Sequence, residues 1–168
     1  MTRLALRLRL GRPGDARAIG VLIRRVVRRW VVPDQPHDAA MALLARLSAQ
    51  VLREKIVGGQ RFHLGYVDDV LVGVSAMRDD CHLTQFFVST RYQGQGIARQ
   101  LWLCTMRDAV RRADTRCFTL NATRCAVPVY RHLGFVETGP EGPSPNGVIT
   151  TPMLLQLALP PVSRRKRA

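Results

Sequence analysis

Hydrophobic residues follow two different periods in the middle of the chain, between residues 83 and 113. The first part is rich in aromatic and β-branched side chains, which is typical of a buried strand; its apolar members are Leu83, Phe86, Phe87 and Val88. The second part has apolar residues at every third or fourth position, which indicates a helix packed on a sheet; they are Ala98, Leu101, Trp102, Met106, Ala109, Val110 and Ala113. The pattern therefore predicts a strand, a turn that contains Gly94 and Gly96, and a long helix.

The part of the chain before this stretch predicts a strand, two helical stretches and a hairpin. Leucine alternates with arginine over residues 4–10, as in a strand with one buried face. Pro13 and Asp15 suit the first turn of a helix, whose predicted buried stripe is Ile19, Leu22, Ile23, Val26, Val27 and Trp30. A second helical stretch covers residues 38–57, with Ser48 as a candidate cap for a restart within it. Residues 62–67 and 71–77 then predict a hairpin.

The part after the long helix predicts a strand at 117–122, a short helix that ends at Gly134 and a strand at 135–138. A loop at 139–147 and a closing strand at 151–159 complete the chain. The predicted order is β-α-α-β-β-β-α-β-α-β-β, an α/β (α+β) arrangement. No run of about 18 apolar residues occurs, so we expect no membrane span.

The glycine turn is suited to binding a phosphate group. The first turn of a helix has unpaired N–H groups and a partial positive charge, and glycine lets the backbone approach an anion closely. Two known phosphate motifs do not fit, because Ile97 and Ala98 stand where a P-loop has Lys-Ser/Thr, and Arg99 stands where a dinucleotide fingerprint has its third Gly or Ala. An ordinary tight turn is the alternative.

Two segments carry a resemblance to a known family. Residues 93–98, QGQGIA, resemble the Q/R-x-x-G-x-G/A signature of the GNAT superfamily of acyl-CoA-dependent N-acetyltransferases. Residues 126–135, AVPVYRHLGF, are similar to the family's A-x-x-x-Y-x-x-x-G-F segment, and they follow a predicted strand as the family order requires. The resemblance covers nearly the whole chain. It implies a central mixed, mostly antiparallel twisted sheet of about seven strands flanked by about four helices. It also implies a single domain at residues 1–160, followed by a basic C-terminal tail at 161–168.

The resemblance further implies that acetyl-CoA is the acyl donor and that no metal is needed. Acetyl-CoA is expected where the strands that end at Val88 and Ala122 separate, with its pantetheine arm paired to the main chain of Phe86, Phe87 and Val88. Its pyrophosphate is expected on the N–H groups of Gln93, Gly94, Gln95, Gly96, Ile97, Ala98 and Arg99. Asn121 and Thr123 are weaker candidates for cofactor contacts, and capping of the next helix is the alternative for Asn121.

The implied reaction is direct attack of a primary amine on the thioester, without an acyl-enzyme. Tyr130 stands at the position of the family's tyrosine and is the candidate acid for the leaving thiolate; a packed tyrosine whose hydroxyl binds a carbonyl is the alternative. Many relatives carry a glutamate base on the strand that here reads HLTQ, which has no carboxylate. We therefore take His82 as the candidate base, with ordered water as the alternative. Alternation places His82 on one face with Thr84 and Phe86. It places Gln85 on the other face, unless a bulge reverses this.

Composition adds two further expectations. The four cysteines are scattered without a C-x-x-C pair, and the first residues lack the apolar core of a signal peptide, so we expect free thiols and a cytoplasmic protein. The net charge of +14 comes almost wholly from arginine. It raises affinity for polyanions and makes a basic nucleic-acid-binding module one alternative function. We favour a solvated basic surface, because aromatic residues are few and no base-reading motif is present.

The expected partner is a small-molecule or peptide amine, and the many arginines favour one that also bears a carboxylate or phosphate. Neither a membrane nor a nucleic acid is the expected partner. The sequence leaves the oligomeric state open, and a homodimer is one candidate because dimers are common in the family. A second alternative function is a sensor that binds acyl-CoA without turning it over.

Overall fold

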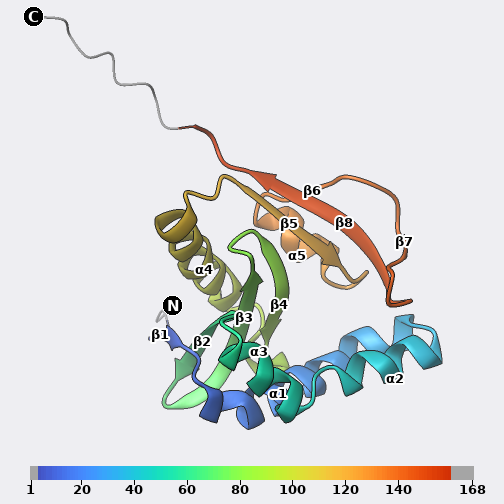
Figure 1. Ribbon diagram of the computed structural model, residues 1–168, viewed down its shortest axis with the longest axis horizontal. Helices are drawn as coiled ribbons and strands as arrows, with labels where there is room; N and C mark the ends of the chain where they lie inside the picture. Colours follow the sequence, from blue (N-terminus) through green and yellow to red (C-terminus); the bar gives the residue numbers. More distant parts are fainter. Residues whose placement is uncertain (1–3, 160–168) are drawn as a thin grey trace, which may run out of the picture.

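An eight-stranded sheet runs through the protein in the order β1-β2-β3-β4-β5-β8-β6, with β7 paired to β8 (Figure 1). The computed structural model describes residues 4–159. The strands are β1 (Arg7–Leu10), β2 (Arg61–Val67), β3 (Val70–Arg78), β4 (His82–Val88), β5 (Cys117–Ala122), β6 (Val136–Glu137), β7 (Gly142–Pro143) and β8 (Ile149–Gln156). All neighbouring strands are antiparallel except β4 and β5, which are parallel.

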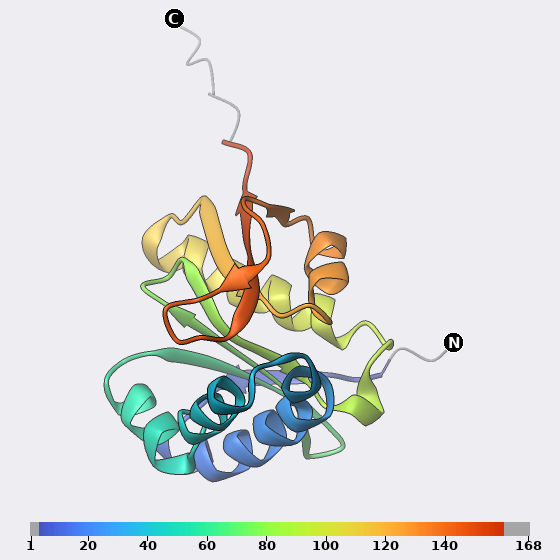
Figure 2. The same cartoon turned by 90° about the vertical axis from the view of Figure 1, so that its right-hand side faces the viewer.

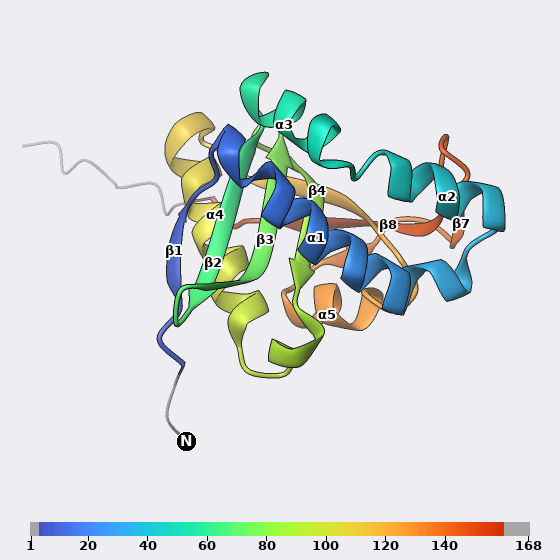
Figure 3. The same ribbon diagram turned by 90° about the horizontal axis from the view of Figure 1, so that it is seen from below.

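Helices cover both faces of this sheet. They are α1 (Ala16–Val26), α2 (His37–Ala45), α3 (Ala49–Val57), α4 (Ile97–Ala113) and α5 (Val127–His132). The first three lie on one side of the sheet and the last two on the other (Figure 2). Helix α1 lies over β3 and β4 (Figure 3), and its Ile19 and Ile23 pack with Val74 and Ala76 in one core cluster. This mixed α/β architecture confirms the predicted fold class.

The structure has one strand and one helix more than expected, for local reasons. The segment predicted as a loop at 139–147 contains the two-residue strand β7. The helical stretch predicted at 38–57 is divided into α2 and α3. The side chain of Ser48 accepts a hydrogen bond from the Val51 N–H at 3.3 Å, so Ser48 caps the restart as predicted.

The first helix differs from its predicted form at its C-terminal end. Helix α1 ends at Val26, and Val27–Val31 form a π-helical turn in which the Val32 N–H donates to the Val27 carbonyl five residues earlier. A π-turn holds more residues than an α-turn and therefore shifts the phase of the following side chains. Val27 stays buried, but Trp30 is 37% exposed, so its assignment to the buried stripe was wrong.

Strands β4 and β5 separate soon after they meet. Only the pairs His82–Thr119 and Leu83–Leu120 join them. In the pairing of β4 with β3, Ala76 lies opposite Gln85 and Met77 opposite Leu83, so Thr84 is the extra residue of a β-bulge. The sheet therefore opens along β4 after the bulge.

The bulge also changes which face each β4 side chain occupies. Leu83 and Phe86 both belong to the core cluster on the side of α4 and α5. His82 instead bonds through Nδ1 to Thr119 Oγ1 at 2.8 Å, and Thr119 alternates with Phe118 and Leu120, which point into that cluster. The expectation that His82 shares a face with Phe86 was therefore wrong, because the extra residue reverses the alternation.

No helix within residues 4–159 has the length and apolar character needed to cross a membrane. The predicted basic tail at 161–168 lies outside the described residues.

Candidate active site

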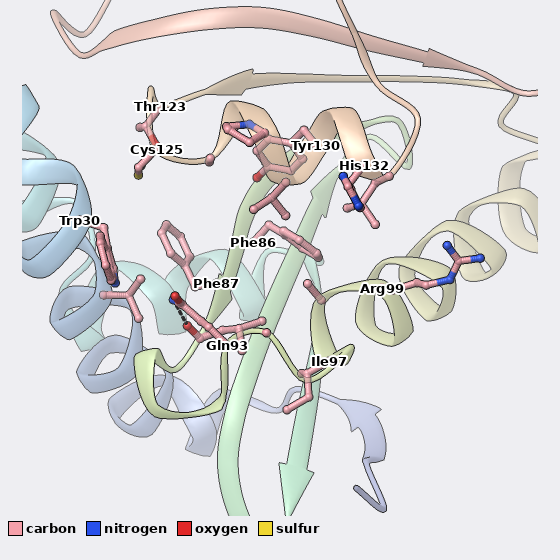
Figure 4. Close-up of a pocket in the computed structure, with 18 of the residues that line it drawn as sticks. Trp30, Phe86, Phe87, Gln93, Ile97, Arg99, Thr123, Cys125, Tyr130 and His132 are labelled. Atoms are coloured by element: carbon pink, nitrogen blue, oxygen red, sulfur yellow. Dashed lines mark hydrogen bonds between the residues drawn. The ribbon is translucent and has the colours of Figure 1, made fainter. Parts of the chain in front are cut away.

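A cavity of about 650 Å³ lies where β4 and β5 separate (Figure 4). Its walls come from the end of α1 with the π-turn, from β4, from the glycine turn with the start of α4, and from α5 with the segment that leads into it. Of the site residues expected from the sequence, the following line it: Phe86, Phe87, Val88, Gln93, Gly94, Gly96, Ile97, Ala98, Arg99, Thr123 and Tyr130. The fold thus brings together segments that are about 100 residues apart in the sequence.

The glycine turn forms the floor of the cavity and begins α4. Gly94 and Gly96 have φ values of +73° and +80°, in the left-handed region that other residues rarely adopt. A Cβ atom built at either position would meet no atom within 4 Å, so the backbone conformation rather than crowding favours glycine there. Gly96 has no side chain that could cap the helix, and the N–H groups of the first turn are left open to an anion.

The free edge of β4 forms a second wall. The Ser89 N–H bonds to the Val72 carbonyl of β3 at 2.8 Å. Backbone groups of neighbouring strand residues point to opposite edges, so the N–H groups of Phe86 and Val88 face the open edge. The Val88 carbonyl on that edge accepts a hydrogen bond from Gln93 Nε2 at 3.0 Å, which ties the glycine turn to the strand. An extended ligand could pair with this edge.

Tyr130 lies on α5 and is only 8% exposed. Its ring packs between those of Phe86 and Phe135, each with a centroid distance of 5.8 Å. Within residues 4–159 its hydroxyl makes no hydrogen bond, although its ring lines the cavity. Burial, and then the nearby Cys125, raise the pKa of the Tyr130 phenol well above its ordinary value. The group is therefore a neutral hydrogen-bond donor without a partner, and it does not bind a carbonyl.

Three of the expected residues do not line the cavity. Gln95 and Asn121 are exposed, and α5 has no side-chain cap, so the alternative role of Asn121 as its cap is also not seen. His82 is partly buried at the start of β4, on the opposite face from Phe86. Burial, and then Arg78, lower the pKa of His82. The structure therefore does not bring His82 together with Tyr130.

Several lining residues were not among the sequence candidates, and Trp30 is the most prominent. Its Nε1 donates to Thr90 Oγ1 at 3.1 Å, which ties the π-turn to the short 3-10 helix before the glycine turn. Helical periodicity assigned Trp30 to the core, and the only local signal was its place just before the helix-breaking segment at 31–37. The others are Val26, Val31, Tyr92, Cys125, Ala126, Pro128, Val129, His132 and Leu133.

A second buried polar group lies away from the cavity, between α4 and β2. Asp108 accepts hydrogen bonds from Arg61 at 2.6 Å and from Arg111 at 2.9 Å, and His63 Nε2 is 3.4 Å away. Burial raises the pKa of Asp108, but the two arginine hydrogen bonds outweigh it, so the pKa is lowered. None of these residues lines the cavity, and their mutual pairing indicates a structural cluster. We call these four residues the Asp108 cluster.

Comparison with known proteins agrees with this geometry. Residues 31–157 match the family described as acetyltransferase (GNAT) domain. A search of curated protein sequences finds no match. The fold is similar to a GCN5-related N-acetyltransferase from Rhodopseudomonas palustris, at 18% identity and a TM-score of 0.78, over 94% of this chain and 99% of the other.

Two further solved structures share the fold. The PaiA N-acetyltransferase from Thermoplasma acidophilum, solved with coenzyme A, has 13% identity and a TM-score of 0.72, over 91% of this chain and 99% of the other. A chimera of the spermidine N-acetyltransferase SpeG from Vibrio cholerae and hSSAT has 19% identity and a TM-score of 0.64, over 90% of this chain and 95% of the other. At these identities the structures show the fold alone, whereas the family match covers most of the chain. The chain belongs to the GNAT acetyltransferase family.

Proposed function

We propose that the protein is an acetyl-CoA-dependent N-acetyltransferase that transfers the acetyl group to a primary amine by direct attack in a ternary complex. The observation that carries this proposal is the Tyr130 hydroxyl, which has no hydrogen-bond partner within residues 4–159 and belongs to a buried residue that lines the cavity. Family membership supports acetyl transfer as the reaction class. We further propose that residues 1–160 form one domain, and a cytoplasmic location and a homodimer stay predictions.

In the proposed complex, acetyl-CoA lies along the open edge of β4. Its diphosphate rests on the first-turn N–H groups of α4, beside Arg99, and its pantetheine arm pairs with the free backbone groups of Phe86. The N–H of Val88 then donates to the thioester carbonyl and stabilises the oxyanion that forms when the amine attacks. These groups are fixed by secondary structure, so little reorganisation is needed at the moment of reaction.

Collapse of the tetrahedral intermediate breaks the carbon–sulfur bond and releases the CoA thiolate. The ammonium form of the acceptor loses one proton to solvent before it attacks. Tyr130 then donates its proton to the sulfur, and the second proton, which the nitrogen loses as the amide forms, restores the Tyr130 phenol. We propose that the proton of the amine leaves through water, because His82 lies outside the cavity and none of the lining residues is Asp or Glu. The lining histidine, His132, lies at the Arg99 end, where the diphosphate is placed. A His82→Asn variant should then keep the acid limb of its pH–rate profile. An altered limb would return His82 to the mechanism.

Thermal unfolding with acetyl-CoA, followed by CoA release with a panel of amines, tests the proposal. Bound ligand stabilises the folded state by mass action, so the melting temperature should rise with acetyl-CoA concentration. Direct attack requires a ternary complex, so double-reciprocal plots of rate against one substrate at several fixed concentrations of the other should intersect. Cys125→Ala should stay active, because no acyl-enzyme forms on a cysteine. A melting temperature that rises without CoA release from any amine would favour the sensor, and salt-sensitive RNA binding with no effect of acetyl-CoA would favour the nucleic-acid-binding module.

A further inference from the structure

The two ends of the cavity differ in chemistry (Figure 4). Arg99 and His132 lie at one end, next to the start of α4. Trp30 lies at the other end, near Thr123 and Cys125, and Tyr130 is between the two ends. If the diphosphate rests on the α4 N-terminus, as proposed above, the end at Trp30 is left for the acceptor. We call it the Trp30 end.

The Trp30 end is apolar and lacks anionic groups. Its walls include Val26, Trp30, Val31 and Phe87. Within the part of the chain that the structure describes, no aspartate or glutamate lines the cavity. Outside it, Glu141 is held by Arg124 through two hydrogen bonds, at 2.6 and 3.1 Å. A polyamine or an aminoglycoside carries several positive charges, and each charge needs a carboxylate or water when it is bound. The Trp30 end offers no carboxylate, so the cavity disfavours such acceptors.

A cationic side chain outside the cavity, Arg29, also disfavours acceptors with several positive charges. The Arg29 guanidinium lies 4.8 Å from the centroid of the Trp30 ring, where it occupies one face of the indole. A second cation would be repelled by Arg29 and would have to compete for the same ring. The arginine-rich composition favoured an anionic acceptor, but among residues 4–159 no arginine lines the Trp30 end to bind one.

Trp30 is held in place and does not collapse onto the core. The π-turn takes it off the buried stripe, and the hydrogen bond to Thr90 fixes the direction of the indole. At 37% exposure a large part of its apolar surface remains accessible. Phe87, across β4 from Phe86, supplies a second ring in the lining. Such a wall suits an aryl or alkyl group, which gains free energy by leaving water.

We infer that the acceptor is a monoamine with an apolar, aryl-bearing body, of the arylalkylamine class, whose ring packs at the Trp30 end. This inference rests on the proposed N-acetyltransferase function. The amino group then lies toward Tyr130 and the thioester, and its charge is lost before attack, so no carboxylate is required to hold it. Discrimination comes from burial of the apolar body rather than from recognition of charge.

The test compares 2-phenylethylamine, ethylamine and spermidine as acceptors at saturating acetyl-CoA, with CoA release as the readout. We expect kcat/KM for 2-phenylethylamine to exceed that for each of the others at least tenfold, which is the range of a buried apolar group. Trp30→Ala should raise KM for 2-phenylethylamine at least fivefold and leave the KM for ethylamine within twofold. Trp30→Phe, the matched control, should restore most of the affinity, and the acetyl-CoA-induced rise in melting temperature should stay the same in both variants.

The outcomes separate the inference from the function on which it rests. Spermidine or ethylamine used as well as 2-phenylethylamine, or an unchanged KM in Trp30→Ala, would overturn the inference and leave the N-acetyltransferase function standing. A Trp30-dependent preference for hexanoyl-CoA over acetyl-CoA would also overturn it, because the apolar end would then hold the acyl chain. No CoA release from any amine would remove the proposed function, and the inference with it.

Discussion

The cavity and the Asp108 cluster both bury polar side chains next to α4, but they treat these groups in opposite ways. In the Asp108 cluster one carboxylate has two arginine partners and a nearby imidazole. In the cavity the Tyr130 hydroxyl has no partner within residues 4–159, although the residue is 92% buried. A paired buried carboxylate stabilises one fold, whereas a hydroxyl without a partner beside an open cavity is free to bind a ligand. His63 Nδ1, which also has no partner, does not face the cavity. A search for clustered charged side chains alone would have selected the Asp108 cluster rather than the cavity as the candidate active site.

The largest expected effect comes from breaking the Asp108 cluster. Asp108→Ala leaves Arg61 partly buried without its partner, and removal of one member of a buried ion pair costs about 3 kcal/mol of unfolding free energy. Urea unfolding measures this loss, and kcat should stay unchanged at temperatures where the variant is folded. Glu141→Ala, which removes an exposed ion pair, is the control and should show no measurable loss. Equal stability of both variants would contradict a structural role for the cluster.

Substitution of Tyr130 is expected to lower kcat and leave stability unchanged, the reverse of the result at Asp108. Tyr130→Phe removes the proposed proton donor and should lower kcat about 100-fold, in the range of general acid catalysis. Its melting temperature and its response to acetyl-CoA should stay close to those of the parent, because within residues 4–159 the hydroxyl makes no hydrogen bond that the variant would lose. Steady-state rates and thermal unfolding together check this prediction. A full-rate variant would exclude Tyr130 from the mechanism.

Substitution of Gly96 in the glycine turn tests whether backbone conformation shapes the cavity. At Gly96→Ala the left-handed φ of +80° costs about 1 kcal/mol for any residue with a Cβ. We expect that loss of unfolding free energy, together with weaker acetyl-CoA binding in titration calorimetry. Gly14→Ala is the matched control, because a Cβ there meets no atom within 4 Å and its φ is not positive. Similar losses at both glycines would contradict the conformational explanation.

The smallest effect is the pH dependence of stability that comes from His63. Burial lowers the pKa of this imidazole, despite the opposing charge of Asp108, and its Nδ1 is buried without a hydrogen-bond partner. The unfolded chain therefore binds a proton that native His63 does not, and stability should fall as the pH drops below about 6.5. His63→Asn should reduce the slope of melting temperature against pH between 7 and 5. A slope that stays the same would assign the effect to other groups, among them His82, whose pKa is lowered in the same direction.

Local signals in the sequence located the parts of the site that depend on neighbouring residues. The sequence pattern predicted the β5 strand at its observed bounds, and the glycines marked the start of α4 within one residue. The Ser48 cap was likewise predicted, because a cap involves only residues three positions apart. Such features follow from intrinsic backbone preferences and short-range hydrogen bonds. All the residues that take part in them lie within one short stretch of the chain.

Tertiary structure decided the rest. The bulge at Thr84 arises from the pairing of β4 with β3, and it moves His82 to the face opposite Phe86. The π-turn that directs Trp30 into the cavity is tied to Thr90, 60 residues away. Arg61 and Asp108 are 47 residues apart in the sequence and meet only because α4 packs on β2. A shift of one residue in a turn or a strand redirects every side chain after it, and only the packed fold selects that shift.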